Sequence, residues 1–167
     1  MPFLLSASPA YAGLPLVTAF GADDVELAVG ESVRTLITDG NAQRRHQLAR
    51  FIHDESRTTG PFIRYSFRTD HPLGLARRAE SMPSLFARAR GGTLFIDEIS
   101  SMSSEDQAEW SRGLLSSEHP RLIAGAGPHL RQQVENGAFD RRLFYWLNAI
   151  HLVARSLWAP VAVDSVR

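Results

Sequence analysis

The stretch from Gly91 to Ser100, with the sequence GGTLFIDEIS, constrains the fold of this chain more than any other. Two glycines open it, β-favouring and apolar residues follow, and the adjacent carboxylates Asp97 and Glu98 come next. An apolar run without alternation is typical of a strand that is buried on both faces in a parallel sheet. Ligands of open α/β sheets bind at the carboxyl ends of such strands. The stretch therefore predicts a central strand with an acidic end that faces a ligand site.

Composition limits the remaining possibilities. The 167 residues suffice for one compact domain, and 44% hydrophobic with 22% charged residues is ordinary for a soluble protein. The formal net charge is zero, so bulk electrostatics give no argument for nucleic acid or a membrane surface. There is no cysteine, and the six histidines lack metal-ligand spacing, so we expect no metal site. Because no stretch has the pattern of a signal peptide or a membrane span, we expect a cytoplasmic location.

The basic residues are unusual, since all 18 of them are arginine and lysine is absent from the sequence. A guanidinium is wider, planar and more strongly basic than an ammonium, so the two are not interchangeable in a tight site. The chain therefore has no lysine for a phosphate-binding loop or for a Schiff base.

Alternating strand and helix patterns predict an α/β domain. The helical pattern runs over residues 42–56, and a second helix starts with a cap at Ser103 and runs to about Leu115. Residues 21–30 read as a loop that contains a short apolar piece, residues 25–29. The predicted strands, besides the central one, are residues 33–38, 60–67, 121–125 and 150–153.

Several motifs resemble the AAA+ domain of bacterial sigma-54-dependent transcription activators. They are GGTLFIDEI at residue 91, GAFDRRLFYWLN at residue 137, LARFIH at residue 48 and GPFIRYSF at residue 60. The resemblance covers residues 35–153 and implies a three-layer P-loop NTPase fold with a central parallel five-stranded sheet. It also makes Asp97 and Glu98 the Walker B pair, which in P-loop ATPases holds Mg²⁺ and polarises the attacking water.

The phosphate-binding loop of that family is not preserved. The pattern G-x-x-x-x-G-K-[ST] falls on residues 39–46, where Asp39 and Arg44 replace the two glycines, Arg45 replaces the lysine, and His46 takes the last position. Gly40 lies within this vestigial Walker A segment. Side chains at the glycine positions obstruct close approach of phosphate, and Asp39 adds negative charge. We therefore expect no cofactor, since tight binding of Mg²⁺-ATP requires the geometry that has been lost.

The family's sensor and arginine-finger positions have changed as well. By the resemblance, the sensor asparagine falls on Gly127, and the two finger arginines fall on Asp140 and Trp146. Arg141 and Arg142 are displaced from the first finger position by one and two residues, which turns them about 100° and 200° away on a helix. We take Asp140, Arg141, Arg142 and Trp146 as candidate residues for binding a partner. The remaining residues of this stretch have the pattern of core or packing residues, namely Phe139, Leu143, Tyr145 and Leu147.

Two parts of the activators have no counterpart in this sequence. Residues 68–80 contain nothing like the GAFTGA loop that engages the sigma factor, so we expect no sigma-54 contact. The helical lid and the DNA-reading helix-turn-helix also have no room, so we expect no direct DNA binding. We divide the chain into a lead-in segment, residues 1–30, a degenerate AAA+ core, residues 31–155, and a tail, residues 156–167.

Three functional hypotheses follow. The first is a pseudo-ATPase that acts in transcriptional or signalling regulation by binding another protein, such as an intact AAA+ activator or another regulator. The second is a module that binds ATP or a cyclic dinucleotide through Arg44, Arg45 and Arg50 with little hydrolysis. An active ATPase is the third and is disfavoured by the altered loop.

Overall fold

The computed structural model describes residues 11, 13–68, 80–115 and 119–155. Within them, five strands form one sheet in the order β2-β3-β4-β1-β5, and all four neighbouring pairs are parallel. This confirms the predicted α/β class and the five-stranded parallel sheet. The strands are β1 (Thr35–Thr38), β2 (Phe62–Ser66), β3 (Thr93–Asp97), β4 (Arg121–Ala126) and β5 (Ile150–Val153).

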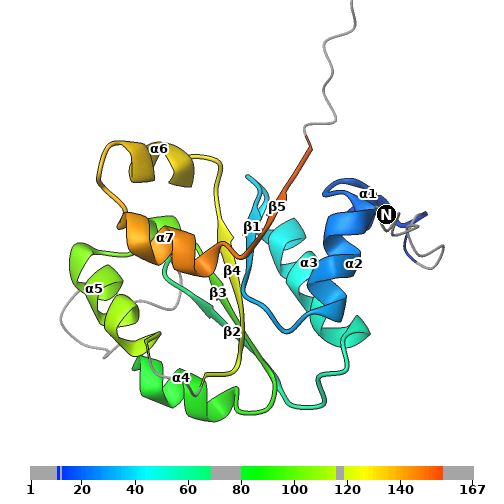
Figure 1. The fold of residues 1–167 in the computed structure, drawn as a ribbon, viewed down its shortest axis with the longest axis horizontal. Helices are drawn as coiled ribbons and strands as arrows, with labels where there is room; N and C mark the ends of the chain where they lie inside the picture. The colour runs from blue at the N-terminus through cyan, green and yellow to red at the C-terminus, as the bar shows by residue number, and fades with distance from the viewer. Residues whose placement is uncertain (1–10, 12, 69–79, 116–118, 156–167) are drawn as a thin grey trace, which may run out of the picture.

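Helices cover both faces of the sheet, as Figure 1 shows. One face carries α1 (Pro15–Thr18), α2 (Ala22–Gly30) and α3 (Ala42–Glu55), and the other carries the remaining four helices. Those four are α4 (Met82–Arg88), α5 (Ser104–Gly113), α6 (Leu130–Glu135) and α7 (Arg141–Leu147), and a short 3₁₀ turn, Ile99–Ser101, follows β3.

Period-two alternation along the central strands divides the core into two clusters. In β3, Leu94 and Ile96 pack with α4, α5 and α7, whereas Phe95 packs with α1, α2 and α3. All five residues of β3 are buried. The continuous apolar run is therefore explained by a strand with a helical layer on each side.

The prediction for residues 21–30 was wrong. They form the helix α2, in which Val25 and Ala28 are fully buried at helical spacing. No proline interrupts the segment, and Asp23 and Asp24 in the first turn suit the positive end of the helix dipole. The apolar piece is thus the buried stripe of an amphipathic helix, and it packs in the same cluster as Leu48 of α3.

The other differences are smaller. The helix that starts at Ser103 ends at Gly113, with Leu114 as its cap, rather than at Leu115. Tyr145 was predicted to be a core residue, but it is 66% exposed, whereas Phe139, Leu143 and Leu147 are buried. Most of the stretch predicted to lack the sigma-contact loop, residues 68–80, lies outside the described residues, since residues 69–79 are not described. The tail at 156–167 also lies outside them. Across the described helices, none has the length and apolarity that a membrane span requires.

Candidate functional site

The turn between β1 and α3 is shorter than a phosphate-binding loop. β1 ends at Thr38 and α3 begins at Ala42, so only residues 39–41 of the vestigial Walker A segment lie outside regular structure. Asn41 caps the helix by accepting a hydrogen bond from the amide of Arg44 at 3.0 Å. Gly40 does not have a positive φ, so no anion-binding nest of the usual glycine-rich form is present. Residues 42–46, which the family pattern places in the loop, lie in the first turns of α3 instead.

Asp39 occupies this turn as an internal anion. Its carboxylate accepts the amide of Asn41 at 2.9 Å and the guanidinium Nη2 of Arg44 at 2.8 Å, with a second contact from Arg44 Nε. Burial alone would raise the pKa of Asp39, but the hydrogen bonds of Arg44 and Asn41 outweigh it and lower the pKa. The amide and the guanidinium that could meet a phosphate are therefore taken by the chain's own carboxylate.

Arg45 lies at the centre of the site and is 1% exposed. Its guanidinium reaches from α3 across the carboxyl end of the sheet and donates three hydrogen bonds. Nε donates to Asp97 Oδ1 at 2.7 Å, Nη2 to Glu98 Oε1 at 2.5 Å, and Nη1 to the carbonyl of Asp39 at 2.5 Å. Both Walker B carboxylates are thus bonded to one buried cation.

The charge on Arg45 is secured by these partners. Burial works to lower the pKa of Arg45, but Asp97 and Glu98 outweigh it and raise the pKa above its usual value. Glu98 has a left-handed backbone with φ 56°, which no other non-glycine residue has in the described part of the chain. A strained backbone of this kind persists where the surroundings hold it, and here the strain places the Glu98 carboxylate against Arg45.

Close packing continues behind Asp97. A Cβ on Gly125 would lie 2.4 Å from Asp97 Oδ1, so only glycine fits at this point of β4. Asp97 itself is fully buried, and its second oxygen, Oδ2, is buried with no hydrogen-bond partner. Gly127, at the sensor position, has open space around it and carries no side chain that could orient a water.

These residues do not fit a magnesium nucleotide. A P-loop ATPase offers free backbone amides and a lysine to the phosphates, and a Walker B aspartate to Mg²⁺. Here the side chains of Asp39 and Asn41 accept the amides of Asn41 and Arg44, lysine is absent from the sequence, and Arg45 occupies the carboxylates. No group of three or more potential metal ligands is found among the described residues.

The candidate partner-binding residues lie on or next to α7. Asp140 is the N-cap of that helix and accepts the amide of Leu143 at 2.6 Å, so its carboxylate stabilises the helix instead of projecting from it. Arg141 and Arg142 are exposed in the first turn. Trp146 is half-buried beneath Arg34, whose guanidinium lies 4.0 Å from the ring centroid. Arg34 was not predicted, because this contact joins residues far apart in the sequence.

The two histidines of α3 pack against the sheet. His46 stacks on Phe62 and Phe95, with ring centroids 5.9 and 6.1 Å away, and burial lowers its pKa. His53 is buried, with Nδ1 2.9 Å from the hydroxyl of Thr93. Neither histidine belongs to a metal site or reaches Asp97 through a hydrogen bond that the structure contains.

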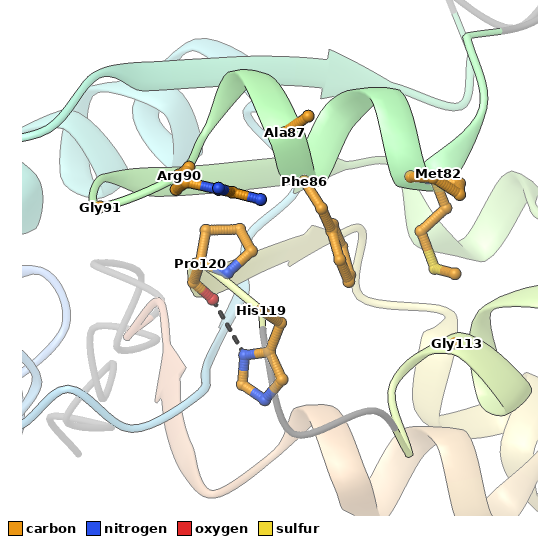
Figure 2. Close-up of a pocket in the computed structure, with 9 residues that line it drawn as sticks. Met82, Phe86, Ala87, Arg90, Gly91, Gly113, His119 and Pro120 are labelled. Carbon is orange, nitrogen blue, oxygen red and sulfur yellow. Dashed lines mark hydrogen bonds between the residues drawn. The ribbon is translucent and has the colours of Figure 1, made fainter.

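The other side of the sheet carries several hollows, and two of them border the C-terminal end of α5. The α4–α5 groove, of about 680 Å³, has Met82 and Phe86 on one wall and His119 and Pro120 on the other, with Arg90 at its edge. Figure 2 shows Met82 and Phe86 pointing from α4 into this groove, towards the segment before β4 that carries His119. The α5–α7 cleft is smaller, about 240 Å³, and is lined mainly by Leu114, Leu115, Leu143 and Trp146, with Arg112 and Arg142. Both hollows are separate from the Arg45 site.

Comparison with known proteins decides the family. Residues 23–156 match the family described as the sigma-54 interaction domain. The chain belongs to that family. Regulatory protein AtoC of Escherichia coli is 31% identical over 156 residues, which are 78% of this chain and 34% of AtoC. The DNA-binding transcriptional regulator NtrC of Rhizobium meliloti is 26% identical over 170 residues, covering 84% of this chain and 35% of NtrC. This sigma-54 interaction domain therefore spans about a third of the length of these regulators.

Solved structures show the same fold. NtrX from Brucella abortus in complex with ATP superposes with a TM-score of 0.71 at 21% identity, covering 87% of this chain and 38% of NtrX. The P-loop NTPase domain of a sigma-54 activator from E. coli gives a TM-score of 0.57 at 20% identity, covering 74% of this chain and 97% of that domain. At these identities the likeness concerns the fold alone, which is that of a P-loop NTPase domain.

Proposed function

We propose that this sigma-54 interaction domain is a pseudo-ATPase that regulates by binding another protein. The observation that carries the proposal is the buried Arg45 guanidinium, which bonds both Asp97 and Glu98. In an active ATPase these two carboxylates serve Mg²⁺ and the attacking water, and a cation bound between them prevents both roles. A fold that is kept while its chemistry is removed acts through its surface.

The relatives supply the context of the proposal. AtoC and NtrC are regulators by name, so bacterial transcriptional control is the setting in which we place this chain. Its partner in the proposal is an intact AAA+ activator or another regulator of the same system. Contact with sigma-54 is not included, because residues 68–80 do not contain a GAFTGA-like sequence.

The contacts weaken the alternative of a nucleotide-binding module. That hypothesis needs free guanidinium groups at the start of α3. Arg44 pairs with Asp39, Arg45 with Asp97 and Glu98, and Arg50 with Asp54 one turn further on. A phosphate would have to displace a carboxylate from each arginine. We therefore keep the protein-binding hypothesis alone.

A phosphate-release assay tests the proposal. The purified chain with Mg²⁺ and ATP should release phosphate no faster than its Asp97→Ala variant, because any shared background then comes from contaminants. Adding the chain to a purified intact sigma-54 activator should change the activator's ATPase rate. Hydrolysis by the chain that disappears in Asp97→Ala would overturn the pseudo-ATPase assignment, and an unchanged activator rate would remove that class of partner.

A further inference from the structure

The α4–α5 groove and the α5–α7 cleft lie on either side of the end of α5. Gly113 lines the groove, while its neighbours Arg112 and Leu114 line the cleft. His119 connects the two, since it lines the groove and its ring meets that of Trp146, in the cleft, with centroids 5.5 Å apart. Together they form one apolar surface across α4, α5 and α7, which we call the α5 surface.

Every ionisable side chain that lines the α5 surface is basic. These are Arg90 and His119 in the groove and Arg112 and Arg142 in the cleft. Arg34 adds a further cation over Trp146. The structure contains no ion pair between any of these four arginines and a described acidic residue. Among the acids of the nearest elements, Glu80 pairs with Arg88, Asp140 caps α7 and Asp106 caps α5. Glu109 of α5 lines a separate hollow together with Glu80 and Asp106.

The apolar part of the surface lacks cover among the described residues. Leu115 is 82% exposed and lines the cleft. Tryptophan and arginine beside an apolar pocket are the residues that dominate the energetics of protein interfaces. The cleft, at 240 Å³, is below the range of sites for small organic ligands and has the size to take a bulky side chain.

We propose that the α5 surface binds an acidic amphipathic segment of a partner protein, which places a bulky apolar side chain in the cleft. Carboxylates of the segment pair with Arg112 and Arg142, since guanidinium binds carboxylate through two parallel hydrogen bonds. A second apolar side chain, one or two helical turns away, lies in the groove beneath Arg90. This identifies the chemistry of the partner and rests on the proposed function.

Nucleic acid would also be drawn to arginine, but it fits this surface less well. Single-stranded nucleic acid binds by stacking bases on open aromatic faces. Of the cleft's lining residues Trp146 alone is aromatic, and Arg34 lies over its ring while His119 meets it at a steep angle. The other apolar residues of the cleft are leucines, and leucine side chains contribute to binding by burying apolar surface instead.

Defined peptides test the proposal by fluorescence anisotropy. The probe is a labelled helical peptide of about twelve residues, with glutamates on one face and leucine or tryptophan at i, i+4 and i+7 on the other. One control peptide has alanine at the apolar positions, and another has lysine in place of glutamate. Leu115→Glu and Arg142→Glu should each weaken binding of the acidic apolar peptide at least about tenfold. The matched control is Arg131→Glu, at an 86% exposed side chain on α6, which should change the affinity for this peptide less than about twofold.

Each other outcome counts against the proposal. It is overturned if no acidic peptide binds at millimolar concentration, if the alanine peptide binds equally well, or if Arg131→Glu weakens binding as much as Arg142→Glu. An oligo(dT) probe that binds with the same dependence on Leu115 would assign the surface to nucleic acid. Self-association that Leu115→Glu abolishes would assign it to a second copy, whose exposed Asp24, Leu27 and Glu31 on and beside α2 provide an acidic face. None of these results alters the ATPase assay, so the two proposals fail separately.

Discussion

At the scale of single residues, the buried guanidinium of Arg45 determines what the site can contain. A guanidinium has five donors in a planar fork, and here three of them reach Asp97, Glu98 and the carbonyl of Asp39. The sequence predicted that Arg45 keeps the positive charge and loses the phosphate geometry. It did not predict that Arg45 pairs with Asp97 while Arg44 pairs with Asp39. The sequence does not distinguish two adjacent arginines, because their directions depend on where the helix begins.

Removing Arg45 should strongly destabilise the folded state. In Arg45→Ala, two carboxylates remain at a buried site without their cation, and we expect a loss of about 3–5 kcal/mol in the free energy of unfolding. Arg50→Ala on the same helix breaks an exposed i, i+4 pair with Asp54 and a contact over the ring of Phe62, and it should cost about 1 kcal/mol. Urea unfolding measures both. Equal losses in the two variants would mean that Arg45 does not neutralise the site.

A compensating variant separates charge from packing. Arg45→Met with Asp97→Asn and Glu98→Gln removes the buried charges together, and it should recover much of the stability that Arg45→Ala loses. A triple variant as unstable as Arg45→Ala would show that the hydrogen-bond geometry of the guanidinium, rather than its charge, supports the fold.

At the scale of elements, sequence patterns succeeded where a run had a clear period and failed where it was short. The strand at 93–97 was clear because both of its faces are apolar. Residues 21–30 were wrongly predicted to be a loop because a short apolar piece lies between two glycines. Such a piece looks the same in a loop and in a short helix that is stabilised by packing. In the finger region no helix was predicted, and the cap role of Asp140 depends on where α7 begins.

Asp140 should behave as a helix cap. We expect Asp140→Ala to lower the free energy of unfolding by about 1 kcal/mol, because the amide of Leu143 loses its acceptor. Asp140→Asn keeps an acceptor oxygen and should lower it by much less. Chemical denaturation distinguishes the two. If both variants are as stable as the wild type while binding of an activator is lost, Asp140 contacts a partner instead.

The packing of α3 on the sheet should depend on pH. Burial is the main cause that lowers the pKa of His53 below its usual value of 6.5, with Arg50 and Arg121 adding to it and Asp54 opposing it. The folded state therefore binds fewer protons than the unfolded state as pH falls below about 6.5, so the stability from neutral His53 is complete above that pH and is lost below it. His46 has the same sign.

Thermal unfolding at about pH 7.5 and about pH 5.5 measures this effect. The melting temperature should be lower at the acid pH, and His53→Gln should reduce the difference. The depressed pKa of Asp39 contributes only at pH values near and below its usual 3.8, so this carboxylate does not act in the same window. A pH difference that is unchanged in His53→Gln would contradict the assignment.

At the scale of the whole molecule, the family and the sheet were predictable and the state of the site was not. The motifs around Gly91 and Gly137 carried the family, which residues 23–156 then matched as a whole. The α5 surface had no signal beyond Trp146 and Arg142, since it is assembled from segments as distant as Met82, Arg112 and Trp146. Surfaces of this kind arise from topology, which brings residues together without any local pattern.

The central claim is that Arg45 has taken the place that Mg²⁺ and phosphate hold in an active relative. Calorimetric titration of the folded chain with Mg²⁺-ATP, ADP and cyclic dinucleotides tests this claim most directly. The variant Arg45→Lys, in which a compact ammonium replaces the planar guanidinium, is titrated beside it. We predict no binding heat at millimolar nucleotide for the wild type, because Asp97 and Glu98 stay bonded to Arg45. Saturable binding of Mg²⁺-ATP at micromolar concentration, abolished by Asp97→Ala, would contradict the claim.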